Sequence, residues 1–215
     1  MRLLLIRHAQ TVWNATGRVQ GQADPPLSDL GRAQCAALGQ RLAGFELDAL
    51  YSSDLGRARL TADAIAAATG APVQLDAGLR EVGLGEWEGI DRERLARDYP
   101  ALFEVWRRAP SWDIVPGGEG GDEFRRRVVD TVSRLVAGAP DAATVALVTH
   151  IGVIRMVLSM VAGLEPLGLR WPWAIDNTAI STLVGPPDVA AWTTSALQVM
   201  AINDGVHLAP LEAAG

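Results

Sequence analysis

Short apolar runs alternate along the chain with longer segments of helical spacing. Residues 3–6 form an unalternating apolar run, and residues 145–149 form a second one. Such runs are typical of strands that are buried on both faces of a parallel sheet. Further strands are expected at residues 49–51, 73–75, 181–184 and 196–202. Strands that alternate with helices predict an α/β fold with a mostly parallel sheet.

The segments between these strands carry apolar residues at helical spacing. Ser28 and Ser53 precede two of them, and each serine is expected to cap the N-terminus of a helix. Gly70 is expected to end the second helix. Helices are also expected at about residues 119–137 and 151–161, the latter apolar nearly all round and therefore buried. The expected buried face of the first helix consists of Leu30, Ala33, Ala37, Leu38 and Leu42.

Residues 76–121 are less regular and contain several glycines and prolines. Two short helices are expected inside this stretch, near residues 91–98 and 100–107. We interpret the stretch as a small helical cap that is inserted into the fold. A length of 215 residues suits one domain. We therefore predict a single three-layer α/β/α domain over residues 1–215, with the cap at about 76–121.

Composition excludes several classes of protein. Apolar residues make up 49% and charged residues 20%, which excludes a disordered or fibrous chain. The net charge of −6 argues against nucleic acid or an anionic membrane as partner. All 19 basic residues are arginine, so chemistry that needs a lysine amine is excluded. The single cysteine, Cys35, suits a reducing compartment, and no targeting or membrane-spanning segment is visible, so we expect a cytoplasmic protein.

Polar side chains follow the predicted strands. Arg7 and His8 come directly after the first strand, Arg57 lies one helical turn beyond the second, and His150 follows the clearest buried strand. The carboxyl ends of parallel strands lie at one edge of a sheet, where such folds bind ligands. We therefore expect the two arginines and two histidines to meet there, with Glu81 of the irregular segment nearby.

These side-chain types predict phosphoryl chemistry. Two guanidinium groups at one mouth repel each other unless an anion such as phosphate lies between them. A neutral imidazole can attack phosphorus, and a carboxylic acid can protonate the leaving oxygen. Arginines can stabilise the transferring group where metals do so in other enzymes. Ser52 and Ser53 are interpreted as caps rather than nucleophiles, and Glu81 competes with Glu86 and Glu88 for the acid role.

Several motifs, in the same order along almost the whole chain, resemble the histidine phosphatase superfamily, also called phosphoglycerate mutase-like. They are LIRHAQTVWN at 5–14, QG at 20–21, SSDLGRA at 52–58, LRE at 79–81 with GEWEG at 85–89, PGGE at 116–119 and VTHIGVIR at 148–155. Each motif alone is weak, and their order makes the resemblance specific.

The resemblance implies a phosphoglycerate mutase-like fold and a set of site residues. By this resemblance, His8 is the nucleophile that becomes phosphohistidine, and Glu81 gives a proton to the leaving alcohol. Arg7, Arg57 and His150 are implied to hold the phosphoryl oxygens. Asn14, Gln20, Gly21 and Ile151 are implied to lie in the same pocket. No metal and no cofactor is implied, and the chain's three histidines show no zinc-ligand spacing.

Two positions depart from the family pattern, and each bears on the pocket. Ala9 stands where the family usually has glycine, which requires that this residue avoid a positive φ. Ile151 stands where the family usually has glycine after the histidine, and its side chain is expected to narrow the pocket. The stretch 81–89 lacks the mutase-type sequence and the chain lacks lysine, which favours the phosphatase branch, as in cobalamin-pathway and broad-specificity phosphatases.

We therefore predict a metal-independent phosphatase that acts on small-molecule phosphomonoesters through phosphohistidine. A 2,3-bisphosphoglycerate-dependent phosphoglycerate mutase and an inactive phosphate-binding or interaction module are the alternatives. We expect no nucleic-acid or membrane partner, and a homodimer stays open. Trp106 or Trp112 is hypothesised to line the pocket and to favour apolar or aromatic substrates. The three arginines at 125–127 are expected to form a solvated helix face that pairs with Asp122 or Asp130.

Overall fold

The computed structural model describes residues 1–137, 139–140, 143–164, 173–186 and 197–212. Its strands are β1 (Arg2–Arg7), β2 (Ala49–Ser52), β3 (Val73–Leu75), β4 (Thr144–Thr149), β5 (Ile180–Val184) and β6 (Gln198–Asp204). Its helices are α1 (Val12–Ala15), α2 (Asp29–Leu42), α3 (Gly56–Thr69), α4 (Arg92–Asp98), α5 (Pro100–Arg108), α6 (Gly121–Val136), α7 (Ile151–Val161) and α8 (Ala209–Glu212), with short 3₁₀ turns between them. Every strand and helix expected from the sequence is present, with ends shifted by a few residues, although residue 196 of the last expected strand lies outside the described residues.

The six strands form one sheet in the order β3-β2-β4-β1-β5-β6. β3, β2, β4 and β1 pair in parallel, whereas β5 runs antiparallel to β1 and β6 antiparallel to β5. The prediction of a mostly parallel sheet is confirmed. This order places the carboxyl ends of β1 and β4 side by side at the centre of one edge, with that of β2 next to β4.

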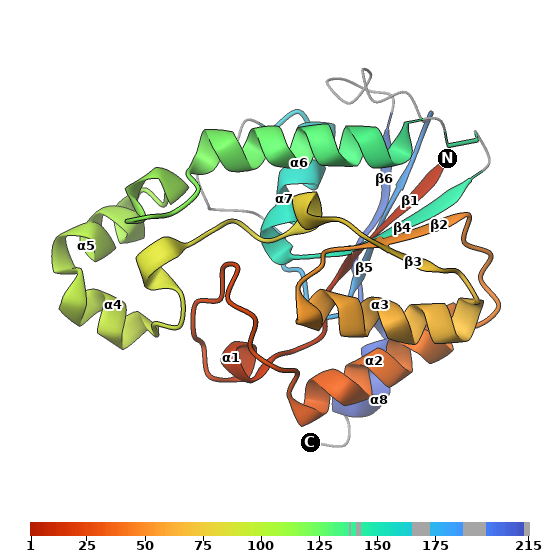
Figure 1. The fold of residues 1–215 in the computed structure, drawn as a ribbon, viewed down its shortest axis with the longest axis horizontal. Helices are drawn as coiled ribbons and strands as arrows, with labels where there is room; N and C mark the ends of the chain where they lie inside the picture. The colour runs from red at the N-terminus through yellow and green to blue at the C-terminus, as the bar shows by residue number, and fades with distance from the viewer. Residues whose placement is uncertain (138, 141–142, 165–172, 187–196, 213–215) are drawn as a thin grey trace.

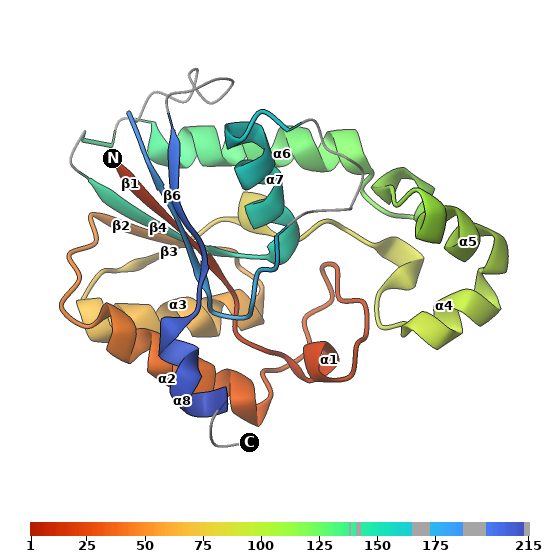
Figure 2. The ribbon, with the colours of Figure 1, turned by 180° about the vertical axis from the view of Figure 1, so that it is seen from behind.

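Helices cover both faces of the sheet, which confirms the three-layer architecture (Figures 1 and 2). Leu3 and Leu5 of β1 belong to the core that includes residues of α6 and α7. Leu4 and Ile6 belong to the core on the opposite face, which includes residues of α2 and α3. The alternation of side chains along a strand therefore explains why an unbroken apolar run was required here. None of the described helices is long and apolar enough to cross a membrane.

Two of the expected helix ends are confirmed, and one is wrong. The Ser28 hydroxyl accepts the Gly31 amide and caps α2, and Gly70 ends α3 with φ of 78°. Ser53 does not cap α3, because the helix begins only at Gly56. The Asp24 carboxylate accepts the Gly56 amide at 2.6 Å instead, so a side chain from a distant loop caps this helix.

The expected buried face of α2 is wrong at Leu30, whose side chain is 43% exposed. The buried residues are Gly31, Gln34, Cys35, Leu38, Gly39 and Leu42. A Cβ at Gly31 would lie 2.0 Å from the Gln10 carbonyl oxygen, so the helix approaches the rest of the fold through this glycine. Because the side of the helix at Gly31 faces the fold, the neighbouring Leu30 faces solvent.

Helices α4 and α5 lie at one end of the molecule, away from the layers that cover the sheet (Figure 1). They belong to the stretch predicted to form a cap. Aromatic rings hold this region together, with the Trp87 ring centroid 6.5 Å from that of Tyr99 and 6.3 Å from that of Trp106. Trp87 and Leu95 also join the core beneath α6 and α7, which connects the cap to the sheet.

Candidate active site

A pocket of about 260 Å³ opens beyond the carboxyl end of β1, between the sheet and the cap. We call it the strand-end pocket. Eight of the nine predicted site residues line it, and these are Arg7, His8, Asn14, Gln20, Gly21, Arg57, Glu81 and Ile151. The ninth, His150, is fully buried beside His8, with ring centroids 5.1 Å apart. The sheet edge has therefore gathered the residues that the sequence predicted.

The His8 imidazole is oriented by a backbone hydrogen bond and affected by nearby positive charge. Its Nδ1 lies 2.7 Å from the Ala9 carbonyl oxygen, which can only accept, so Nδ1 carries the proton and Nε2 keeps its lone pair. Burial, and after it the charges of Arg57 and Arg7, hold the pKa of His8 well below its usual value. The imidazole is therefore neutral at pH 7.

The alanine that departs from the family pattern fits without strain. Among the described residues only Thr178 and Asn203 have a positive φ apart from glycines, so Ala9 meets the requirement stated from the sequence. Its amide donates to Thr61 Oγ1 at 2.9 Å, and its side chain is fully buried. Asn177 Nδ2 donates to the His8 carbonyl at 2.9 Å, which fixes the backbone on the other side.

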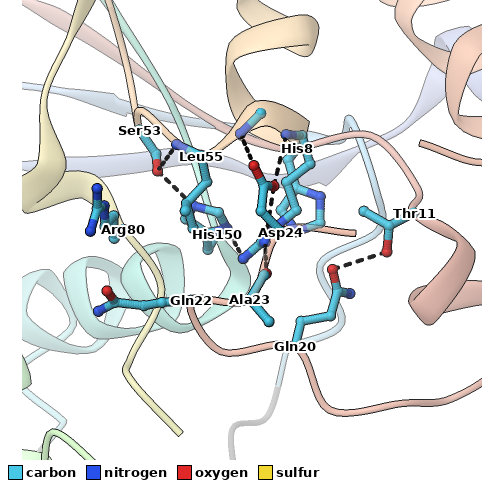
Figure 3. Close-up of polar contacts among 12 residues, drawn as sticks. His8, Thr11, Gln20, Gln22, Ala23, Asp24, Ser53, Leu55, Arg80 and His150 are labelled. Carbon is cyan, nitrogen blue, oxygen red and sulfur yellow. Dashed lines mark hydrogen bonds and ion pairs between the residues drawn. The ribbon is translucent and has the colours of Figure 1, made fainter. Parts of the chain in front are cut away.

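Arg57 and His150 form one buried unit, and His150 lies beside Ser53 (Figure 3). The Arg57 guanidinium donates to the carbonyls of Gly21 and Ala23 and to His150 Nδ1 at 3.3 Å. A guanidinium can only donate, so His150 Nδ1 accepts and Nε2 donates to Ser53 Oγ at 2.9 Å. Burial and the Arg57 charge hold the pKa of His150 well below its usual value. Ser53, expected as a helix cap, instead orients this histidine.

Arg7 supplies the second cation of the sheet edge. Its Nη1 donates to the Ile175 carbonyl at 2.6 Å. Burial lowers the pKa of Arg7 to about 10, against the opposing effect of Glu81, so the side chain stays charged at neutral pH. The Nε–H groups of Arg7 and Arg57 are buried and find no acceptor among the described residues. Two charged donors at one mouth suit the oxygens of a phosphoryl group.

Glu81 is held against the first turn of α7. Its carboxylate accepts the amides of Val82 at 3.0 Å and Gly152 at 3.1 Å. A Cβ at Gly152 would lie 2.1 Å from Glu81 Oε1, so only glycine permits this contact. The competing Glu86 accepts the Tyr99 hydroxyl and does not line the strand-end pocket.

The third carboxylate, Glu88, organises the loop that carries two other pocket residues. It accepts the amides of Gln22, Ala23 and Leu84. Gly21 beside it has φ of 53°, and a Cβ there would lie 2.2 Å from Glu88 Oε1. Thr11 Oγ1 donates to Gln20 Oε1 at 2.9 Å, which ties Gln20 to the short helix α1 (Figure 3). Of the three candidate carboxylates, only Glu81 therefore faces the pocket.

The remaining wall of the strand-end pocket is apolar and comes mainly from the cap. Trp106 and Trp112 both line it, as hypothesised from the sequence, and Trp87 lines it as well. The other apolar residues of the lining are Val19, Val82, Leu84 and Leu95. Ile151 also lines the pocket, as the resemblance implied. Arg18 is the one further charged residue of this lining in the part of the chain that the structure describes.

The expectation for the arginine run at 125–127 is confirmed only in part: Arg125 and Arg126 are exposed, but Arg127 is not, and none of the three pairs with Asp122 or Asp130. Arg127 pairs with Glu119, not with Asp122 or Asp130, and it donates to backbone carbonyls next to Glu81. Arg127 lies three residues beyond the buried Phe124, on the side of α6 that faces the protein, and that spacing could have signalled its position.

Metal ligands do not cluster in the part of the chain that the structure describes: no three His, Cys, Asp or Glu side chains are arranged to hold an ion there. His207, the third histidine, is buried, and its Nε2 lies 3.2 Å from the Thr178 hydroxyl. This agrees with a structural role for His207.

Comparison with known proteins agrees with the site. Residues 3–196 match the histidine phosphatase superfamily, branch 1. A glucosyl-3-phosphoglycerate phosphatase of Mycolicibacterium vanbaalenii is 37% identical over 177 residues, which cover 80% of this chain and 77% of that protein. A probable phosphoglycerate mutase of Erwinia tasmaniensis is 31% identical over 97% of this chain and 95% of its own.

A solved structure of a mycobacterial glucosyl-3-phosphoglycerate phosphatase in complex with VO3 is similar in fold. Its TM-score is 0.81 at 31% identity, over 95% of this chain and 99% of that one. The resemblance stated from the motifs is confirmed, including the likeness to phosphatases. The chain belongs to the histidine phosphatase superfamily.

Proposed function

We propose that this protein hydrolyses small-molecule phosphomonoesters through a phosphohistidine on His8. The observation that carries the proposal is the geometry of the strand-end pocket: the His8 Nδ1 is bonded to a backbone carbonyl, which leaves Nε2 for the substrate, and the same pocket is lined by two arginines and the Glu81 carboxyl group. Arginine donors around the pocket stabilise the charge of the transferring phosphoryl group.

The reaction has two steps that share the same groups. In the first, His8 Nε2 bonds to phosphorus, the bond to the leaving alcohol breaks, and the Glu81 carboxyl proton passes to the leaving oxygen. In the second, a water oxygen bonds to phosphorus, its proton passes to the Glu81 carboxylate, and the P–N bond breaks. Phosphate leaves, and neutral His8 and protonated Glu81 are restored.

The apolar wall supports a substrate class. Trp87, Trp106 and Trp112 offer flat apolar surface to the alcohol part of the substrate. We therefore propose phosphomonoesters whose alcohol has an apolar or aromatic portion as the preferred class. The relative named as a glucosyl-3-phosphoglycerate phosphatase makes that compound a member of the substrate panel.

The mutase alternative is supported by the relative named as a probable phosphoglycerate mutase. A mutase must hold a bisphosphate intermediate, which calls for additional cations near the mouth of the pocket. Beyond Arg7 and Arg57, the described residues of the lining offer only Arg18 as a further cation, and the chain has no lysine. The small number of cations in the lining therefore favours hydrolysis over the mutase reaction. The inactive-module alternative is opposed by the presence of His8, Glu81 and both arginines in one lining.

Two measurements test the proposal. The first is kcat/KM over a panel of p-nitrophenyl phosphate, phenyl phosphate, phosphoserine, 3-phosphoglycerate and glucosyl-3-phosphoglycerate, together with interconversion of 2- and 3-phosphoglycerate in the presence of the bisphosphate. The second is rapid quenching with a ³²P-labelled substrate, which should trap acid-labile label on His8. Interconversion faster than hydrolysis would favour the mutase, and absence of turnover on every substrate would favour the inactive module.

The proposed setting of the enzyme follows from its one thiol. Cys35 is the one cysteine of the chain, so no internal disulfide can form, and such a chain suits a reducing compartment. We propose the cytoplasm as that compartment and a small phosphomonoester as the ligand.

A further inference from the structure

We infer that Arg127 is a positioning residue for Glu81 and acts together with Glu119. The inference rests on the proposed role of Glu81 as the proton donor. Arg127 Nη1 donates to the carbonyls of Gly78 and Arg80, each at 2.8 Å, and Nη2 donates to the Glu81 carbonyl at 3.1 Å. One side chain of α6 thus holds the backbone just before and at Glu81.

Glu119 holds the backbone that follows Glu81 in the chain. Its carboxylate pairs with Arg127 through two contacts of 2.6 and 2.7 Å. The same carboxylate accepts the Gly83 amide at 3.1 Å, and the Glu119 amide donates to the Gly83 carbonyl at 2.9 Å. We call this pair with its backbone partners the clamp. It fixes the chain at Gly78, Arg80, Glu81 and Gly83.

The clamp uses the full geometry of a guanidinium. Arginine has five N–H donors in a planar fork. Here Nε bonds Glu119, Nη1 bonds two carbonyls, and Nη2 bonds a carbonyl and Glu119, so five acceptor contacts match five donors. A lysine ammonium has three donors and no plane and cannot reproduce this set.

The clamp acts on the catalytic group without touching the substrate. Arg127 and Glu119 do not line the strand-end pocket; they line an open cleft on the other side of the Glu81 segment. The Glu81 carboxylate itself is held by two amides, Val82 of the clamped segment and Gly152 of α7. Because proton transfer requires placement within about 0.5 Å, loosening this backbone should impair the acid specifically.

The test compares Arg127→Gln with Arg126→Gln, an exposed neighbour on the same helix. Each variant is assayed over aryl and alkyl phosphates of graded leaving-group pKa. For Arg127→Gln we expect a loss of about tenfold or more in kcat/KM on alkyl phosphates and under about twofold on p-nitrophenyl phosphate, whose leaving group needs little protonation. Arg126→Gln should match the wild type throughout, and Arg127→Lys should not restore the alkyl rates.

A double-mutant cycle separates this inference from the proposed function. In a Glu81→Gln background, Arg127→Gln should add little, because the acid it positions is already gone. If Glu81→Gln slows good and poor leaving groups equally, the proposed role of Glu81 is wrong. If Glu81→Gln shows the leaving-group dependence but Arg127→Gln slows all substrates equally, or the two losses multiply, only the clamp inference is overturned. Circular dichroism verifies folding, and Glu119→Gln provides the same test should Arg127→Gln not fold.

Discussion

The strand-end pocket has two walls that are built by different physics. The sheet wall consists of Arg7, His8 and Arg57, which come from separate parts of the chain and are tied by directional hydrogen bonds to backbone carbonyls. The cap wall consists of Trp87, Trp106 and Trp112 from one inserted stretch. Ring contacts hold it, and the buried indole N–H groups of Trp87 and Trp106 have no partner among the described residues.

Because of this difference, we expect the sheet wall to determine the rate of phosphoryl transfer and the cap wall to determine which substrates bind. Directional bonds fix the sheet wall to the geometry that phosphoryl transfer requires. Apolar packing is not directional, so the cap wall can contribute affinity for many alcohols without defining one orientation. Changes in the sheet wall should therefore act on kcat for all substrates, whereas changes in the cap wall should act on KM according to the substrate.

The largest expected effect is that of removing the nucleophile from the sheet wall. His8→Asn should lower kcat by about 10⁴-fold or more on every phosphomonoester, because no phosphohistidine can form. The melting temperature should stay close to that of the wild type, which thermal unfolding by circular dichroism would verify. Substantial turnover by a folded His8→Asn variant would remove His8 from the nucleophile role.

Gly152→Ala tests the position of Glu81, which belongs to neither wall and lies against the first turn of α7. The added Cβ would lie 2.1 Å from Glu81 Oε1, so the carboxylate has to leave its site on α7. We expect a loss of about 10- to 100-fold in kcat/KM on alkyl phosphates, in line with the loss of a general acid. Helix propensity alone would make the alanine variant more stable than the wild type. A lower melting temperature would therefore indicate the steric clash between the new Cβ and Glu81. Unchanged rates on alkyl phosphates would show that Glu81 works from another position.

Changes in the cap wall should be smaller and depend on the substrate. Trp106→Ala or Trp112→Ala removes apolar contact area and should raise KM for aryl phosphates about tenfold with little change in kcat. Val105→Ala is the matched control, since this side chain on α5 is 48% exposed and does not line the pocket. Unchanged KM for aryl phosphates in both tryptophan variants would reject the role of the cap in choosing the substrate.

The same two walls explain what the sequence could and could not predict. His8 and His150 follow apolar runs, and parallel strands bring their carboxyl ends together, so the meeting of these residues follows from local pattern. The capping of α3 by Asp24 and the bonds from Arg127 to the backbone at 78–81 join residues more than 30 positions apart through loops that have no periodicity. Ser53 has the composition of a cap, but the buried His150 supplies a competing partner for its hydroxyl.

The electrostatics of the sheet wall predict a pH dependence of stability. Burial and nearby arginines keep the pKa values of His8 and His150 well below the ordinary value near 6.5, so the folded protein binds fewer protons than the unfolded chain does. The free energy of unfolding should therefore be maximal above about pH 6.5 and should decrease as the pH falls below it. Urea unfolding between pH 7.5 and 5.5 measures this decrease, and it should be shallower in His8→Asn. If NMR titration of the imidazole signals found ordinary pKa values for both His8 and His150, the proposed cause of this pH dependence would be wrong.

The smallest expected effect is that of a metal chelator, and it tests what supplies positive charge to the sheet wall. Arg57 is buried and Arg7 is partly buried, and both line the pocket as cations whose N–H groups can face a phosphoryl group, so an ion would duplicate their charge and be repelled by them. Hydrolysis of p-nitrophenyl phosphate should therefore be unchanged after prolonged incubation with excess EDTA and removal of the chelator by dialysis. A large loss that a divalent cation restores would mean that the arginines do not suffice. A bound ion, and not the arginines of the sheet wall, would then stabilise the transferring phosphoryl group. The difference between the two walls would then lie in metal binding and not in directional hydrogen bonds.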